Sequence, residues 1–340
     1  MKSFQGSFPV PRFIRPRAGR RSSIVSLIFL IVLYARLAAH AQQKSETQPL
    51  PCVPSAFSQL IVSEGHLVRV APAQEQTGAG QRHSEIPPAE DTNAVRSDDP
   101  AARKAYKIFE VEARQGRPAA MVNLAVSSLA GWGAPPNAGA ALYWLHAAAG
   151  QNFPLAFYDL GILYFEGCGV QQDYAQAFRF LDQGANLGDP ASQTNLGYLY
   201  DQGLGVPRDR SAAARWYLRA AEQGEPEAQF NLADLLLRGE GVTQDDKSAF
   251  EWFQKAALQG HSTARIMLGS MYAAGRGVPR DLQAAYLWIS AASLQGDTRG
   301  NTTLLALERQ LTASEINQAK VRADVLAHTP KLASEHALLH

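Results

Sequence analysis

Glycine pairs, histidines, tryptophans and two cysteines are the residues of this chain whose type or spacing could serve chemistry. A Gly-x-Gly loop can cradle phosphate with its backbone amides, histidine and cysteine can bind metal, and clustered aromatic rings can hold a ligand. Known catalytic spacings do not occur: the sequence has no Ser-x-x-Lys, Gly-x-Ser-x-Gly, His-Glu-x-x-His or Cys-x-x-Cys. Their absence argues against serine acyl transfer and zinc hydrolysis.

Structural roles explain the remaining candidates better than chemistry does. The Gly-x-Gly pairs follow predicted helices rather than strands and carry no lysine, so they indicate tight turns. The eight histidines are scattered and no pair shares a helix face, so we predict no metal site. The tryptophans recur at one place of a repeating pattern, which indicates packing between layers: Trp144, Trp216, Trp252 and Trp288. The sequence therefore predicts no catalytic residue, no metal and no cofactor.

One pattern of residues repeats along the chain at a fixed offset of 36 positions. Leucine, alanine, aromatic and acidic positions recur in this frame, and so do two glycines in each of five units: Gly131 and Gly133, Gly167 and Gly169, Gly203 and Gly205, Gly239 and Gly241, Gly275 and Gly277. A period in this range is typical of stacked supersecondary units, none of which buries its apolar face alone. We therefore expect a chain of repeats rather than one globular core.

Each unit is expected to contain two helices, and residues 191–224 show the pattern best. The first helix is predicted from Ala191 to Gln202 by the helical spacing of its apolar residues. Gly203 is placed to end this helix in the left-handed conformation, which a side chain would resist. Asp209 is placed to cap the first amides of the second helix.

The consensus of these units resembles the Sel1-like repeat: A-x-x-x-L-G-x-x-Y-x-x-G-x-G-V-x-x-D-x-x-x-A-x-x-W-x-x-x-A-A-x-x-G. Five units match over residues 119–296, and the first departs most, with Ser128, Ala134 and Asn137 at the tyrosine, valine and aspartate positions. The resemblance implies an all-α fold, an α/α superhelical solenoid related to tetratricopeptide repeats. It also implies that the first helices line a concave face that usually holds a protein segment.

The same likeness assigns groove-lining positions to the first helices of three units. They are Tyr158, Ile162, Phe165 and Glu166, then Thr194, Tyr198, Asp201 and Gln202, then Phe230, Asp234, Leu237 and Arg238. Aromatic anchors among carboxylates suit an extended peptide with apolar and basic residues, because aromatic side chains carry much of the energy at interfaces. The alternative is a merely solvated inner surface.

The amino-terminal 41 residues resemble a secretory signal. They contain seven basic and no acidic side chains, an apolar run over residues 24–34, and small residues at Ala39 and Ala41 that predict cleavage before Gln42. An uncleaved anchor is the alternative, although this run of eleven residues falls short of the roughly 20 apolar residues that cross a bilayer. We expect a periplasmic or secreted bacterial protein, with no stable membrane insertion after cleavage.

Other segments flank the repeats. Residues 42–97 are rich in Gln, Pro and Ser and predict a disordered linker, within which the more apolar stretch 56–70 could form a strand pair or a binding segment instead of a sticky linker. A capping helix is expected over 98–118, capping helices over 297–328, and a flexible tail over 329–340. In the last helix, an amphipathic pattern includes Ile316, Ala319, Val321 and Leu326, behind a cap at Thr312 or Ser314 with Glu315.

Charge and cysteine content limit the remaining functions. Without the seven basic residues of the signal, 25 of the 32 basic residues remain against 31 acidic ones, a net charge near −6 that argues against nucleic acid. The spacing of Cys52 and Cys168 neither supports nor excludes a disulfide. The pattern also departs from secreted Sel1-like proteins that carry a cysteine pair in every repeat.

The function that these features predict is a non-catalytic scaffold of the bacterial envelope that binds a protein partner. The resemblance further implies regulation of envelope signalling or of cell-surface polysaccharide. One alternative is a hydrolase of cell-wall or β-lactam substrates, as assigned to some cysteine-rich relatives. The other is a peptidoglycan-binding or glycan-binding module that uses the aromatic groove.

Overall fold

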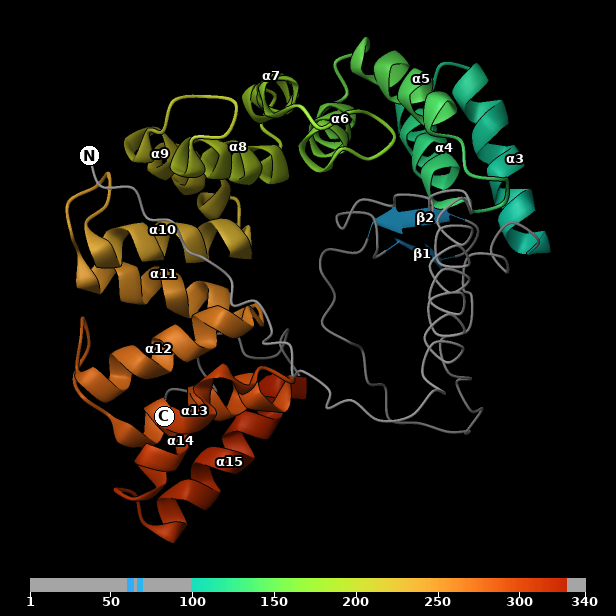
Figure 1. Cartoon of the computed structure of the whole chain (residues 1–340). Helices are drawn as coiled ribbons and strands as arrows, with labels where there is room; N and C mark the ends of the chain where they lie inside the picture. The colour runs from blue at the N-terminus through green and yellow to red at the C-terminus, as the bar shows by residue number, and fades with distance from the viewer. Residues whose placement is uncertain (1–59, 64–65, 70–98, 329–340) are drawn as a thin grey trace, which may run out of the picture. The chain divides into compact units, whose positions relative to one another are not determined.

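The computed structural model describes residues 60–63, 66–69 and 99–328. The predicted signal, most of the predicted linker and the tail after residue 328 lie outside these residues. The described residues contain thirteen α-helices and one two-stranded hairpin. The helical part has the predicted fold class, a solenoid built from consecutive helix pairs, and Figure 1 shows these helices following one another in chain order.

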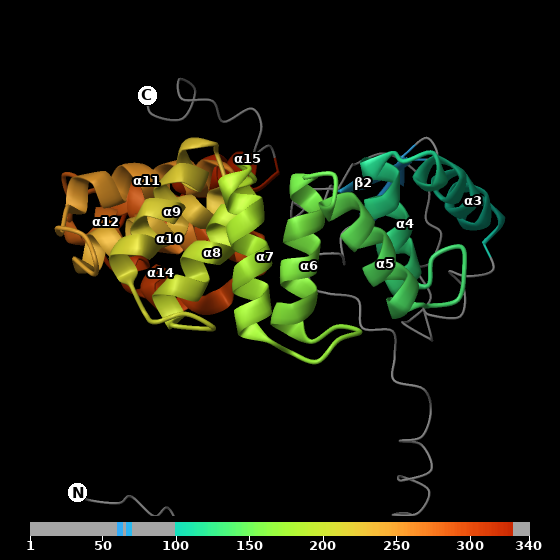
Figure 2. The same ribbon diagram turned by 90° about the horizontal axis from the view of Figure 1, so that it is seen from above.

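The helices form five pairs between end helices. After α3 (Pro100–Arg114), the pairs are α4 (Pro118–Ala130) with α5 (Ala138–Ala149), α6 (Pro154–Glu166) with α7 (Tyr174–Asn186), α8 (Pro190–Gln202) with α9 (Arg210–Glu222), α10 (Pro226–Arg238) with α11 (Asp246–Leu258), and α12 (Ser262–Ala274) with α13 (Leu282–Leu294). The chain continues through η2 (Thr298–Gly300), α14 (Asn301–Glu308) and α15 (Ala313–His328). From α3 to α14 each helix packs on the next, as Figure 2 shows for α6, α7 and α8, and α15 packs on α13.

The hairpin lies within the stretch that the sequence predicts to be a linker. Strand β1 (Leu60–Ser63) pairs antiparallel with β2 (His66–Arg69), so that Ile61 lies opposite Val68 and Val62 opposite Leu67. Within the stretch 56–70, residues 60–63 and 66–69 form the strand pair that was one of the alternatives, and the other residues lie outside the described part of the chain. Ile61, Val62 and Val68 are β-branched, a residue type that favours strands.

Each repeat uses the same signals to begin and end its helices. The first helix of repeat three begins at Pro190 and ends at Gly203, whose φ of 73° is left-handed as predicted. The second helix begins after Asp209, whose carboxylate accepts a hydrogen bond from the Ala212 amide at 2.9 Å. Asn137, Asp173, Asp245 and Asp281 cap the other second helices in the same way. Many of the residues that recur every 36 positions are therefore those that begin or end a helix.

The second glycine of each pair has a role that the sequence reasoning did not assign. Gly205 has a φ of 68°, and a β-carbon there would overlap the carbonyl group of Tyr174 at the start of α7. Gly241 and Gly277 lie equally close to the backbone of Arg210 and Asp246, each at the start of the second helix one repeat earlier. This glycine thus allows the loop of one repeat to rest on the preceding repeat.

The core between the helices is made of small and aliphatic side chains. Leu160, Leu196 and Leu268 are fully buried, and buried alanines such as Ala220 let the helices approach closely. The tryptophans at the frame position fill spaces beside this core: Trp288 is buried, and Trp144, Trp216 and Trp252 are half-buried. Packing explains these rings without a ligand.

The ends of the helical array are covered by helices, with one departure from expectation. At the amino end, Asp99 caps α3 through the Ala101 amide. At the carboxyl end, Thr312 and Glu315 exchange hydrogen bonds in a capping box, as predicted for the start of α15. Val321 is 67% exposed, so its assignment to the apolar face of α15 is wrong. The buried face instead consists of Ala319, Ala323 and Leu326, which are spaced at helical intervals.

Candidate functional site

The twelve predicted groove positions lie on α6, α8 and α10, the first helices of three consecutive repeats. We call these twelve positions the A-helix surface. Their exposure differs: Tyr198, Gln202 and Arg238 are exposed, and Phe165, Glu166, Asp201, Phe230 and Asp234 are half-buried. Tyr158, Ile162, Thr194 and Leu237 are buried, at 9% exposure or less. Exposure is therefore greatest at Tyr198, Gln202 and Arg238, on α8 and α10.

The aromatic residues of the A-helix surface fall into two groups. Tyr198 is 40% exposed and meets Phe165 edge to face, with ring centroids 6.1 Å apart. This pair joins α6 to α8. Phe230 stacks on His261, with centroids 4.7 Å apart, and also touches Phe253. Phe230 is therefore held by the scaffold, whereas Tyr198 offers its ring to the outside.

Carboxylates beside these rings are ordered by arginines. Asp201 forms an ion pair with Arg210 at 2.9 Å, and Asp234 forms one with Arg238 at 3.0 Å. Burial raises the pKa of Asp234, although Arg238 acts in the opposite direction. The surface thus combines an exposed tyrosine with fixed acidic groups, which suits a segment carrying apolar and basic side chains.

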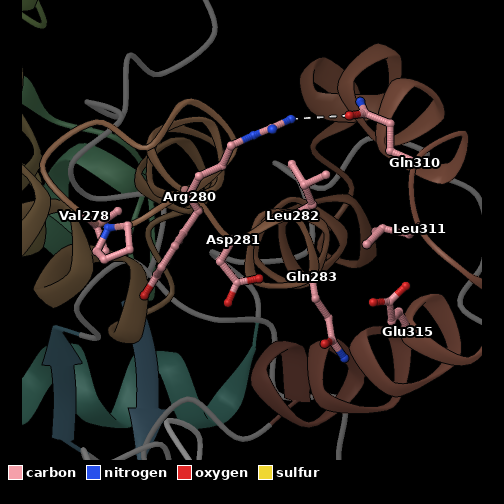
Figure 3. Close-up of a pocket in the computed structure, with 10 residues that line it drawn as sticks. Val278, Arg280, Asp281, Leu282, Gln283, Gln310, Leu311 and Glu315 are labelled. Atoms are coloured by element: carbon pink, nitrogen blue, oxygen red, sulfur yellow. Dashed lines mark hydrogen bonds between the residues drawn. The ribbon is translucent and has the colours of Figure 1, made fainter.

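A cavity of about 600 Å³ lies at the carboxyl end of the array (Figure 3). Its polar side chains have structural partners: Asp281 caps α13, Glu315 caps α15, and Arg280 donates to the Gln310 amide oxygen at 3.3 Å. Leu282 and Leu311 are among its apolar lining residues. The carboxylates cap their own helices and Arg280 joins the last repeat to the end of α14, so these polar side chains have structural roles.

Metal and membrane sites were sought among the described residues. No three His, Cys, Asp or Glu side chains in residues 99–328 are grouped as metal ligands would be. No described helix combines the length and apolar character required to cross a bilayer.

A ladder of polar side chains, in which buried and exposed glutamines alternate, crosses the repeats, and the sequence reasoning missed it. Gln193 and Gln229 are buried at the same frame position, and each donates to a carbonyl eight residues earlier, at 3.2 Å. Gln223 and Gln259 then donate to these two amide oxygens across the repeat boundary, at 2.8 and 2.9 Å. The glutamines recur at the 36-residue offset, which is the signal that could have revealed them.

Arg265 occupies the ladder position in the last repeat and is fully buried. Its guanidinium donates to the carbonyls of Ala257, Ala291 and Leu326 at 3.0, 3.4 and 3.0 Å. These carbonyls belong to the last turns of α11, α13 and α15, where the helix dipoles favour a cation. Burial lowers the pKa of Arg265 to about 10, so the side chain stays charged at neutral pH. Arg265 thereby fastens the end helix α15 to the array.

Cys168, directly after the glycine that ends α6, is disulfide-bonded. The sequence contains one other cysteine, Cys52, which lies outside the described residues. The sequence had left open whether the thiols are paired.

Comparison with known proteins agrees with this geometry. The Sel1 repeat pattern matches residues 118–153, 154–189, 190–225, 226–261 and 262–297, a region that begins one residue before and ends one residue after the region predicted from the sequence. No curated protein matches the chain.

Two solved structures are among those similar to this chain. A Sel1 repeat protein from Oxalobacter formigenes is 32% identical over 56% of this chain and 76% of its own, with a TM-score of 0.51. A protective antigen of uropathogenic Escherichia coli with an SLR fold is 27% identical over 66% of this chain and 56% of its own, with a TM-score of 0.46. Since five consecutive repeat matches cover more than half of its residues, the chain belongs to the Sel1 repeat family.

Proposed function

We propose that this protein is a non-catalytic scaffold that binds a segment of another protein on its A-helix surface. Sel1 repeat proteins are generally protein-interaction scaffolds and generally non-catalytic. The observation that supports the surface is Tyr198, an exposed aromatic ring on α8, which also carries the ordered carboxylate Asp201, while Asp234 lies on α10. An aromatic side chain in such a setting supplies binding energy, and the carboxylates favour a basic partner segment.

Capture from envelope extract tests this proposal with a matched pair of variants. Tyr198 and Leu218 belong to one repeat and are 40% and 39% exposed, but Tyr198 lies on α8 and Leu218 on α9. We expect Tyr198→Ala to weaken retention of the partner by at least tenfold, because aromatic hot spots contribute about 2 kcal/mol or more. Leu218→Ala should retain it like the unaltered chain, with the captured proteins quantified by mass spectrometry.

If both variants retained the partner equally, the A-helix surface would not be its binding site. Tyr198→Ala is preferred over Phe230→Ala because Phe230 packs on His261, which caps α12 through the Ala264 amide. A loss of binding by Phe230→Ala could therefore come from a disturbed helix terminus.

We also propose that the chain acts in the bacterial envelope, after export and removal of residues 1–41. The basic, apolar and small-residue regions of that segment support export. Amino-terminal sequencing of the protein from its native cell should read Gln42 first. A protein that retains residues 1–41 would contradict cleavage and favour the anchor.

The hydrolase and glycan alternatives have little support from described residues. The carboxylates of the cavity in Figure 3 serve as helix caps, and the exposed part of the A-helix surface presents one tyrosine. Turnover of nitrocefin by the purified chain would favour the hydrolase, and cosedimentation with cell wall would favour glycan binding.

A further inference from the structure

Helix α6, like α4, is more deeply buried than α8 and α10, the first helices of the next two repeats. The Asp159 carboxylate is 0% exposed, whereas Asn195 and Asn231, at the same frame position of α8 and α10, are half-buried. Ile162 is 4% exposed, whereas Tyr198 at its equivalent position is 40% exposed. Because the repeats share one backbone frame, the difference indicates that α6 carries a cover that α8 lacks.

A segment packed over α6 would explain the contacts that its residues make. Tyr158, Asp159 and Glu166 all have bonding or ring partners. A fully buried carboxylate needs a compensating cation or several hydrogen-bond donors. The frame supplies asparagine at this position in α4, α8 and α10, so the charge of Asp159 is specific to this helix.

The disulfide of Cys168 identifies a segment that can provide the cover. Cys52 is the one other cysteine, and β1 begins eight residues after it. Eight residues span at most about 26 Å, and the 13 residues of α6 measure about 20 Å. A chain held at Cys168 through Cys52 can therefore place the hairpin anywhere along α6.

The hairpin itself needs a surface to pack on. A two-stranded hairpin alone is marginally stable in water. Five of the eight residues in its strands are apolar, and the other three include the basic residues His66 and Arg69. Its composition thus complements a surface with an isoleucine, a tyrosine and a buried carboxylate.

We propose that the hairpin Leu60–Arg69 docks on α6, that a Cys52–Cys168 disulfide tethers it there, and that Asp159 pairs with one of its basic side chains. The proposal rests on the proposed function because it treats the A-helix surface as a binding surface. The docked hairpin occupies the α6 part and leaves the α8 and α10 parts to the outside partner. A dithiol would cleave the tether: the S–S bond breaks, each sulfur gains a proton, and the dithiol becomes a disulfide.

Hydrogen exchange of the full, oxidised chain tests the docking, and peptide mapping without reductant tests the tether. Cys52→Ser removes the tether outside the described helices, and Asp159→Asn restores the frame residue of neighbouring repeats, so both variants should keep the helical array. We expect the amides of residues 60–69 to exchange slowly in the unaltered chain. They should exchange about tenfold faster in each variant and after dithiol treatment. Asp234→Asn, which also removes a carboxylate from a first helix, should leave the exchange rate of residues 60–69 as it is in the unaltered chain.

Different results would contradict the docking and the disulfide tether. Fast exchange of residues 60–69 in the unaltered chain, or a slow rate that neither variant changes, would overturn the docking. Absence of a linked Cys52–Cys168 peptide would overturn the tether. Loss of partner capture by Tyr198→Ala alongside either result would reject this inference while supporting the proposed function.

Discussion

Gly205→Ala should lower the free energy of unfolding by about 3 kcal/mol, as measured by urea denaturation. Part of the loss, about 1 kcal/mol, comes from holding alanine at the left-handed φ of 68°. The larger part, about 2 kcal/mol, comes from the overlap of the new methyl group with the Tyr174 carbonyl in the preceding repeat. The backbone of α7 would have to move to relieve it.

Gly224→Ala separates these two contributions. Gly224 has a φ of 94°, but a β-carbon there would meet nothing within 4 Å. We therefore expect Gly224→Ala to cost only about 1 kcal/mol. If both variants lost the same stability, the contact of the loop with the preceding repeat would contribute nothing, and the second glycine would only shape its own turn.

Arg265→Ala should cost about 4 kcal/mol, the second large effect. The substitution removes one donor from each of three carbonyls, those of Ala257, Ala291 and Leu326, and opens a cavity between α11, α13 and α15. Faster hydrogen exchange in α15 should accompany the loss, because the guanidinium connects that helix to the array. Thermal melting and exchange of the peptide covering residues 313–328 would measure both effects.

Arg265→Gln is the matched control, since Gln193 and Gln229 occupy this frame position in earlier repeats. Glutamine can keep the bond to Ala257 but cannot span to α13 and α15, so we expect about half the loss. If Arg265→Ala melted like the unaltered chain, the buried arginine would have no role in fastening α15.

Much of the fold could be predicted because its signals are local. Gly203 and Asp209 act on the helix termini beside them, so their types and spacing are enough to predict a helix end and a cap. The structural role of Gly205 and the Gln193–Gln223 bond depend on neighbours about 30 residues away, and these become visible only when the repeats stack. The 36-residue period shows that these residues recur, but it does not show what they contact.

The sequence could predict which helices carry the candidate site, but not which of its side chains are exposed. Analogy placed twelve side chains on three first helices, yet Tyr158 and Ile162 are buried while Tyr198 is exposed. One frame position can be covered or open depending on what packs against that repeat, and a repeat pattern carries no information on this. The misassignment of Val321 has a related cause, because helical spacing alone does not fix which neighbouring stripe faces the array.

Photo-crosslinking in intact cells tests the central claim most directly, the claim that the A-helix surface holds a protein segment. A photoreactive phenylalanine analogue would replace Tyr198 on α8 or Leu218 on α9, two equally accessible positions of one repeat. We expect a discrete crosslinked protein from position 198 that position 218 does not give. The same products from both positions, or none from position 198, would contradict the claim.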